Sequence, residues 1–224
     1  MQKKLNIFEK HHGPHGSPFA AGCLNKAITD KEITPKGSTL MGTSHLIMGI
    51  LTDYLTGQTL PDTHDERILQ KVARFLVDDK GYDKADIFAR KTMTVAVPGK
   101  TGTITVHFTL QVNGVSFAVI MYGPGSIVTR QRPTLAVARL LDAHVIPYAM
   151  ITNGTDANLM DTNTGKIIGK ALSSMPSKSV ALEQMKHLSL NPLPPDRREK
   201  ESRILYAMDI LTHAECSDYV CPLP

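Results

Sequence analysis

The hydrophobic residues of this chain change their period once, and this change restricts the accessible folds more than any other feature. Before Gly81 they recur every three or four positions, as on one face of a helix: Ile68, Leu69, Val72, Phe75 and Leu76. From Thr92 they alternate with polar residues, as along a half-buried strand: Met93, Val95 and Val97, then Ile104, Val106, Phe108 and Leu110. The intervening Pro98–Gly102 segment is typical of a tight turn. We therefore expect an amphipathic helix followed by a β-hairpin.

More strands and one further helix are expected after this hairpin. Asn113-Gly114 predicts a second tight turn, and the nearly continuous apolar run after it is typical of a strand covered on both faces. The segments expected next are a strand, a helix, a strand and a small hairpin: Val115–Tyr122, Pro133–Leu141, Pro147–Thr152, and residues 158–161 with 166–169. A strand, a helix and a strand in this order predict a parallel crossover within one sheet.

The regions outside the sheet are expected to add helices. Residues 46–55 have helical spacing, and Thr63 with Glu66 has the pattern of a capping box, in which both side chains bond free N–H groups at a helix start. Residues 180–188 and about 197–212 are predicted to be helical, the second helix being capped by Asp196.

These predictions define an α/β fold with a mixed sheet: a three-stranded antiparallel meander, a crossover helix and a further strand, flanked by helices. We divide the chain into an N-terminal arm (residues 1–43), the α/β domain (44–170) and a C-terminal helical extension packed on the same domain (171–224).

Composition excludes several classes of protein. Hydrophobic residues make up 42% and charged residues 21% of the chain, which is typical of a globular protein. No run of 18 apolar residues occurs and the first residues lack a signal-peptide pattern, so we expect no membrane partner and a cytoplasmic location. The three cysteines are expected to be reduced thiols, because the spacing of His213, Cys216 and Cys221 matches no standard zinc site.

The charges are unevenly distributed along the chain. The net charge of +4 is too small to indicate a nucleic-acid partner by itself. However, the 55 residues from Ile87 to Leu141 contain no Asp or Glu, whereas the average composition of the chain would place about 5 there. The whole predicted meander lies within this acid-free span.

Several segments together resemble a known family. In order and spacing, over roughly residues 45–170, they resemble the N-terminal nuclease domain of type I restriction enzyme R subunits: Asp65–Gln70 through Tyr82, the meander, Arg139-Leu140-Leu141, Pro147–Gly154 and Asp161–Lys166. The resemblance implies the restriction-endonuclease-like fold of the PD-(D/E)xK superfamily. Active members carry an acidic residue on the second meander strand and Glu-x-Lys on the third, and they cleave DNA with a divalent metal.

The positions that this resemblance assigns to catalysis carry other residues here. His107 falls at the acidic position, Met121 at the Glu and Gly123 at the Lys. Independently of any family, Mg²⁺ requires carboxylate oxygens, and the acid-free meander has none. We therefore expect a degenerate domain with no catalytic residue, no cofactor and no nuclease activity. Glu66 falls at a first-helix acidic position that sometimes assists metal binding in this fold, but the capping role is favoured for it.

The turn after the third meander strand is the strongest candidate for binding phosphate. Glycines let a ligand approach the backbone, helix starts attract anions, and arginine forks grip phosphate. The candidate residues are Gly123, Gly125, Ser126, Arg130 and Arg132. An ordinary strand-to-helix turn with solvated arginines explains the same pattern equally well.

Three functions remain open at this point. The preferred one is a binding or scaffold module that recognises nucleic acid or another polyanion around Arg130 and Arg132. The second is an active endonuclease that holds Mg²⁺ or Mn²⁺ through relocated acids such as Glu66, Asp86 or Asp142. The third is a protein-interaction module whose turn and arm dock a protein partner.

Overall fold

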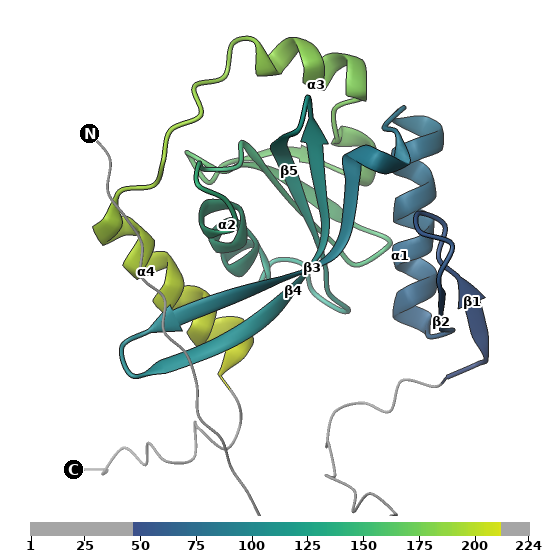
Figure 1. The fold of residues 1–224 in the computed structure, drawn as a ribbon, viewed down its shortest axis with the longest axis horizontal. Helices are drawn as coiled ribbons and strands as arrows, with labels where there is room; N and C mark the ends of the chain where they lie inside the picture. Colours follow the sequence, from purple (N-terminus) through teal and green to yellow (C-terminus); the bar gives the residue numbers. More distant parts are fainter. Residues whose placement is uncertain (1–46, 212–224) are drawn as a thin grey trace, which may run out of the picture. The chain divides into compact units, whose positions relative to one another are not determined.

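The structure, a computed structural model, describes residues 47–211 and has a six-stranded mixed sheet with helices on both faces (Figure 1). The strand order is β3-β4-β5-β6-β7-β8, and all neighbours are antiparallel except β5 and β6. The bounds are β3 Ile87–Val97, β4 Lys100–Val112, β5 Val115–Tyr122, β6 Tyr148–Thr152, β7 Ala157–Asp161 and β8 Ile167–Lys170. The predicted α/β fold, meander, parallel crossover and small hairpin are confirmed. The predicted arm (residues 1–43), His213, Cys216 and Cys221 lie outside the described residues.

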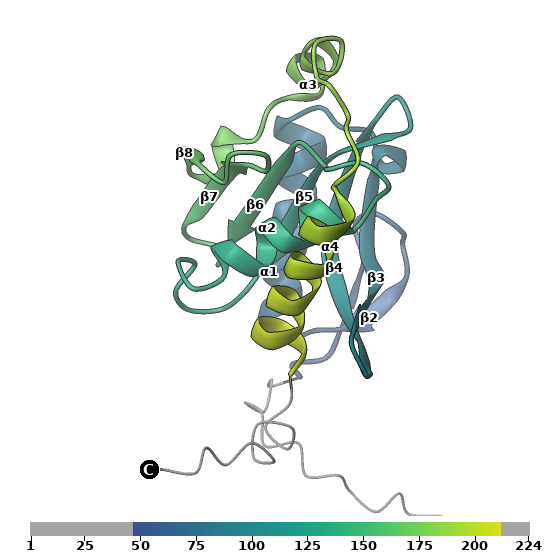
Figure 2. The same cartoon turned by 90° about the vertical axis from the view of Figure 1, so that its left-hand side faces the viewer.

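Helices form a layer on each side of the sheet. Helix α1 (His64–Arg74), which continues into a π-helical turn (Phe75–Asp79), shares one buried cluster with α3 (Lys178–Met185). Helices α2 (Gln131–Leu140) and α4 (Pro195–Leu205), the latter followed by a π-helical turn (Tyr206–Ile210), lie on the other face (Figure 2). The remaining helical elements are two short 3₁₀ turns, Lys84–Asp86 and Leu172–Ser174. Within residues 47–211, no helix has the length and apolar character needed to cross a membrane.

The start of α1 matches the sequence pattern only in part. The Thr63 hydroxyl accepts a hydrogen bond from the Glu66 N–H at 3.1 Å, as expected of an N-cap. However, the Glu66 carboxylate accepts hydrogen bonds from Gln70 and Arg90. The capping-box role predicted for Glu66 is therefore wrong, because a cation from the sheet competes for its carboxylate.

The helix predicted over residues 46–55 is also wrong for the part that the structure describes. Strands β1 (Ile50–Thr52) and β2 (Thr59–Pro61) pair there as an antiparallel hairpin. Ile50 is 78% exposed, so the apolar spacing does not mark a buried face. Asp53 closes the hairpin turn, because its carbonyl accepts from the Gly57 N–H and its carboxylate accepts from the Thr56 hydroxyl.

Helix α4 begins differently from the prediction. Its N-cap is Pro194 and its first residue is Pro195, whereas Asp196 lies within the first turn. Proline suits the first helical position because its missing N–H would have no helical partner there, and its fixed φ is already helical. The Asp196 carboxylate instead lies in the first turn, where its negative charge interacts favourably with the positive end of the helix dipole.

Strand β3 changes the face that it presents to the core halfway along its length. Ile87 belongs to the buried cluster on the α1 side, but Met93 and Val95 belong to the cluster beneath α2 and α4. These three residues would share one face in a regular strand. The change falls at Arg90, whose φ of 56° lies in the left-handed region.

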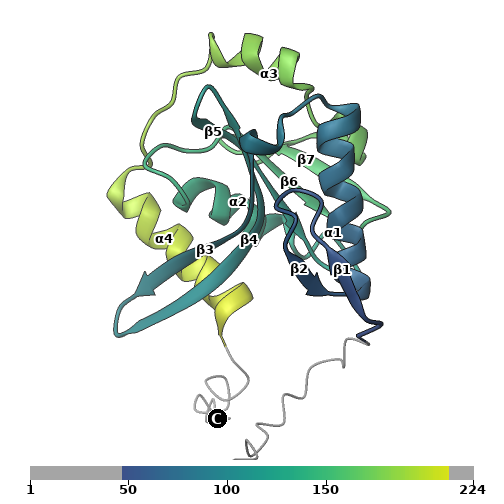
Figure 3. The same ribbon diagram turned by 45° about the vertical axis from the view of Figure 1, so that its right-hand side comes forward.

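Strand β4 also changes the face that it presents to the core, at the position opposite Arg90. Val106 belongs to the α2–α4 cluster and Phe108 to the α1-side cluster, so His107 marks the change. The register pairs Ala89 with Phe108 and Lys91 with Val106, which places His107 opposite Arg90. Beyond this point the two strands form a ribbon, residues 91–106, that runs beside α4 (Figures 1 and 3).

Candidate functional site

The three positions at which the family resemblance implies catalytic residues lie together in the structure. His107 is on β4, Met121 is near the end of β5, and Gly123 directly follows β5. The Tyr122 backbone N–H donates to His107 Nδ1 at 3.2 Å, so the imidazole lies against the backbone between Met121 and Gly123. We take this place on β4 and β5 as the centre of the candidate site and call it the His107 site.

His107 is held in its neutral form. Burial lowers its pKa to about 4, and the nearby positive charges of Arg90 and Arg130 act in the same direction, against Asp65 and Glu66. Because Nδ1 accepts a hydrogen bond from an N–H group, the ring proton is on Nε2. The imidazole therefore carries no positive charge at neutral pH.

Met121 and Gly123 are explained by packing. Met121 is buried in the cluster beneath α2 and α4. A Cβ atom on Gly123 would lie 2.3 Å from Cδ of Arg130, so a larger residue at position 123 would collide with the arginine side chain. The Arg130 side chain thus occupies the space that a longer side chain at position 123 would enter.

Arg90 holds two of the nearest carboxylates. Its Nη1 lies 3.1 Å from Asp53 Oδ2, and its Nη2 donates to Glu66 Oε1. Gln70 Nε2 reinforces this arrangement, because it donates to both carboxylates at 2.8 Å. Although burial raises the pKa of Asp53, the hydrogen bonds from Gln70 and Thr56 and the charge of Arg90 bring it below its usual range.

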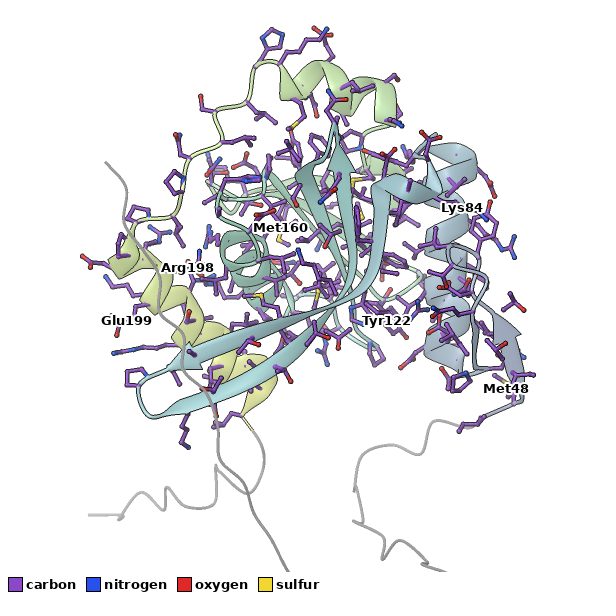
Figure 4. The ribbon with its side chains drawn as sticks, viewed as in Figure 1. Met48, Lys84, Tyr122, Met160, Arg198 and Glu199 are labelled. Carbon is purple, nitrogen blue, oxygen red and sulfur yellow. The ribbon has the colours of Figure 1, made fainter. Side chains whose placement is uncertain are left out.

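A third carboxylate of this region, that of Asp65, lies at the start of α1. It accepts a hydrogen bond from the Tyr122 hydroxyl at 2.8 Å. Figure 4 shows Tyr122 between the sheet and α1. Burial, together with the hydrogen bond and the charge of Asp65, raises the pKa of Tyr122 to about 12, so the phenol remains protonated. The acids around the His107 site are therefore bound to side chains of the protein itself.

The two arginines predicted to bind phosphate have different surroundings. Arg132 Nη1 lies 2.6 Å from Oε2 of Glu201, a carboxylate that is only 1% exposed. The Arg130 side chain is 43% exposed, and its one ion pair within residues 47–211 is a long 3.9 Å contact with Asp209. The charge of Arg130 also acts, after burial and the other nearby charges, to lower the pKa of His107.

The other candidate residues of the turn take part in local structure. The Gly123 N–H donates to the carbonyl of Thr152, and the Gly125 carbonyl accepts from Asn153 Nδ2 at 2.9 Å. The Ser126 carbonyl accepts from the Thr129 hydroxyl at 3.2 Å. Only Gly125, with φ of 81°, needs glycine for its backbone conformation. The structure therefore brings Arg130, but not Arg132, to the His107 site.

The described residues do not fit a divalent metal. Among residues 47–211, no group of three His, Cys, Asp or Glu side chains is placed to hold a metal ion. The three relocated acids considered above have separate partners: Glu66 bonds Arg90, Asp86 bonds Lys178, and Asp142 accepts from the Ser116 hydroxyl. They lie on different elements and do not converge on His107.

Sequence reasoning did not identify Asp53 and Arg90 as parts of this site. Asp53 lay within a segment predicted to be helical, and Arg90 lay at the edge of the predicted meander. The break in face preference between Ile87 and Met93 could have indicated an irregular residue at Arg90. No local pattern indicates that Arg90 would meet Asp53 and Glu66, because the contact depends on the packing of three elements.

The fold and this site define an α/β protein in which the centre of a three-stranded meander carries His107 and a covering arginine. The family described as the type I restriction enzyme R protein N terminus matches residues 64–176, about half of the chain, and includes α1, the meander, the crossover and the terminal hairpin. The chain belongs to this family. Comparison with curated proteins gave no match, and comparison with solved structures gave none either.

Proposed function

We propose that this chain is a non-cleaving member of the family that binds the phosphate backbone of nucleic acid at the His107 site. The observation that carries this proposal is the placement of Arg130. Its side chain covers Gly123 and is 43% exposed, with one long ion pair in the described part of the chain. An arginine guanidinium presents a planar fork of donors that suits phosphate oxygens.

Two further observations favour nucleic acid over other ligands. The strands of the site lie within the acid-free span of residues 87–141, and the carboxylates that adjoin the site from other elements are bound to Arg90 and Tyr122. The family description names a restriction enzyme subunit, which favours nucleic acid over other polyanions. In this proposal Arg130 contacts the phosphate, and His107 supplies a neutral Nε2–H donor beside it.

We expect no cleavage because the site lacks carboxylates that are available to hold a divalent cation. Phosphoryl transfer in metal nucleases needs carboxylates that hold a divalent cation. Here His107 and Met121 provide none, and the carboxylates of Asp53 and Glu66 are both already paired with Arg90. A guanidinium that donates hydrogen bonds to two carboxylates occupies oxygens that a divalent metal would otherwise use as ligands.

A salt titration of DNA binding tests the phosphate contact. By fluorescence anisotropy with a labelled duplex, the logarithm of the binding constant should fall linearly with the logarithm of salt concentration. Arg130→Ala should weaken binding and reduce this slope by about 1, because one phosphate contact is lost. Lys186→Ala, which removes an exposed cation at the C-cap of α3, is the matched control and should leave the slope unchanged. Equal effects of the two substitutions, or no binding at low salt, would exclude the proposed contact.

A cleavage assay tests the other half of the proposal. Plasmid, linear duplex and single-stranded DNA should all remain intact with Mg²⁺ or Mn²⁺, because the site has no free carboxylates to hold the ion. Metal-dependent cleavage that Glu66→Gln abolishes would instead establish an endonuclease with relocated acids.

A further inference from the structure

A groove of about 590 Å³ follows the outer edge of the sheet. One wall is the run Lys91–Ala96 of β3, which is the outermost strand of the sheet. The other side is formed by α4 and the end of α2: Pro195, Arg198, Glu199, Ser202, Leu140 and Leu141. Figure 4 shows Arg198 and Glu199 on α4, which runs beside the ribbon of β3 and β4.

The backbone of β3 has hydrogen-bonding groups directed into this groove. The hairpin turns at Pro98 and Gly99, and Val97 pairs with Lys100. A two-residue turn makes its flanking pair hydrogen-bonded, and the alternation along an antiparallel ladder then turns the N–H and C=O groups of Thr92, Thr94 and Ala96 outward. No strand of the described chain pairs with this edge. An unpaired edge of this kind is a template for another extended chain.

We propose that this groove binds an extended peptide segment of a partner protein, which adds to β3 as a further antiparallel or parallel strand. In this mode of recognition the backbone hydrogen bonds provide affinity and alternate side chains provide specificity. Leu140, Leu141 and Pro195 offer an apolar surface to one set of peptide side chains. This inference is independent of DNA binding at the His107 site.

The charges of the groove indicate an acidic peptide. Lys91 and Arg198 line it, and within residues 47–211 neither has a carboxylate oxygen within 4.0 Å, although the charge of Lys91 contributes to the lowered pKa of Asp142. Arg198 donates instead to the carbonyl of Leu140. The negative charge of Glu199 is offset by Arg203 at 2.5 Å. We therefore assign the groove to a segment in which acidic residues alternate with apolar ones.

The same charges argue against a second copy of this chain as the occupant. Strand β3 contains Arg90 and Lys91 and no acidic residue. Parallel, in-register pairing of β3 with β3 of another copy would place Lys91 beside Lys91, and any other register would bring no carboxylate to either lysine. An acidic peptide would instead bring carboxylates to the positive charges of Lys91 and Arg198.

Peptide binding to the full chain tests this proposal. The probe is a synthetic peptide that alternates valine with glutamate, compared with one that alternates valine with lysine and with an acidic peptide methylated at alternate backbone nitrogens. The valine–glutamate peptide should bind and slow amide hydrogen exchange at Thr92, Thr94 and Ala96. The lysine and methylated peptides should bind at least about tenfold more weakly, through lost charge pairing and lost hydrogen bonds respectively.

Two proline variants locate the binding edge. Thr94→Pro removes an outward N–H without removing a bond of the β3–β4 ladder, as an edge strand tolerates. Thr103→Pro is the matched control, because Thr103 is the register partner of Thr94 and its N–H points to the other side of the ribbon. Thr94→Pro should weaken peptide binding about tenfold or more, and Thr103→Pro should have little effect.

Several results would overturn the proposal. These are equal binding of the methylated peptide, equal loss in both proline variants, or failure of the peptide to protect β3. A dimer of the chain that Thr94→Pro dissociates would assign the groove to a second copy. Protection of β3 in the chain alone that is lost on removal of residues 1–46 or 212–224 would assign it to the chain itself. Because DNA binding is measured separately at Arg130, failure here leaves the proposed function untouched.

Discussion

Two clusters of arginine and carboxylate side chains lie on opposite faces of this sheet, and they differ in the elements that they join. On the α1 side, Arg90, whose side chain is 30% exposed, joins the buried Asp53 and the partly buried Glu66 beside the His107 site. On the other side, Glu201 of α4 meets Arg139 of α2 at 2.9 Å and Arg132 at 2.6 Å, inside the interface between the two helices. The first cluster borders a candidate binding site, whereas the second holds two helices together.

The comparison explains why Arg130 and Arg132 have different roles. The two residues are close in sequence at the start of α2, but they point in different directions because each helical residue rotates by about 100°. Arg132 turns toward the buried Glu201 and Arg130 turns over Gly123. Burial of the partner, rather than the identity of the residue, decides which arginine is available to a ligand. The predictions below test this difference, from the largest effect to the smallest.

Glu201→Gln should have the largest effect on stability. It leaves Arg139 and Arg132 without their buried counter-charge, and breaking a buried ion pair in this way typically costs about 3–5 kcal/mol. Chemical denaturation would measure the change in the free energy of unfolding. Glu199→Gln, two residues earlier on the same helix, removes an exposed pair with Arg203 and should cost less than about 0.5 kcal/mol. Similar losses in the two variants would mean that the Glu201 cluster is not stabilising α4.

The pH dependence of stability should reveal His107. Its folded-state pKa of about 4 is below its ordinary value of 6.5, so the unfolded chain binds more protons between these values. The contribution of neutral His107 to the free energy of unfolding should therefore be fully present above about pH 6.5. It should decrease by about 2–3 kcal/mol as the pH falls toward 4. His107→Gln should flatten this part of the curve, whereas His187→Gln, on an exposed residue, should reproduce the wild-type slope. A wild-type slope in the His107 variant would show that the ring titrates normally.

Arg90 combines an ion pair with a strained backbone, and two substitutions separate these contributions. Arg90→Ala removes the partner of Asp53 and Glu66 but keeps a side chain at φ of 56°, and should cost about 1–3 kcal/mol. Arg90→Gly loses the same ion pairs but relieves the left-handed strain, and should be more stable than the alanine variant by about 1 kcal/mol. Thermal denaturation of both variants would measure the difference. An alanine variant as stable as the glycine variant would place the strain elsewhere.

The smallest effect on stability is expected at Arg130. Arg130→Ala removes an exposed side chain whose ion pair is 3.9 Å long, so unfolding should change by less than about 0.5 kcal/mol. The Arg132 side chain is itself 38% exposed, but Arg132→Ala should cost about 1–3 kcal/mol, because the buried carboxylate of Glu201 loses one of its partners. Denaturation of the two variants side by side gives the sharpest test of the comparison. A reversal of this order would assign the structural role to Arg130.

Much of the fold follows from patterns that are local in sequence. The change of hydrophobic period predicted α1 and the meander, and the order of strand, helix and strand predicted the parallel crossover through α2. Thr63 was predicted to cap α1 because its partner, the Glu66 N–H, is three residues away. The absence of carboxylates at His107, Met121 and Gly123 is likewise a property of the sequence alone, since residues 87–141 contain no acid.

Only the tertiary structure decided the contacts between distant elements. Residues 50–61 form a hairpin because Asp53 and Gly57 close a turn, although the spacing of their apolar neighbours suits a helix. Glu66 bonds Arg90 instead of completing its cap, and Arg132 pairs with Glu201 on another helix. The strength of an ion pair depends on the burial and direction of both partners, which a fold sets through many residues at once. For this reason the sequence determined which side chains were candidates, and packing between elements decided that Arg130 faces solvent at the His107 site.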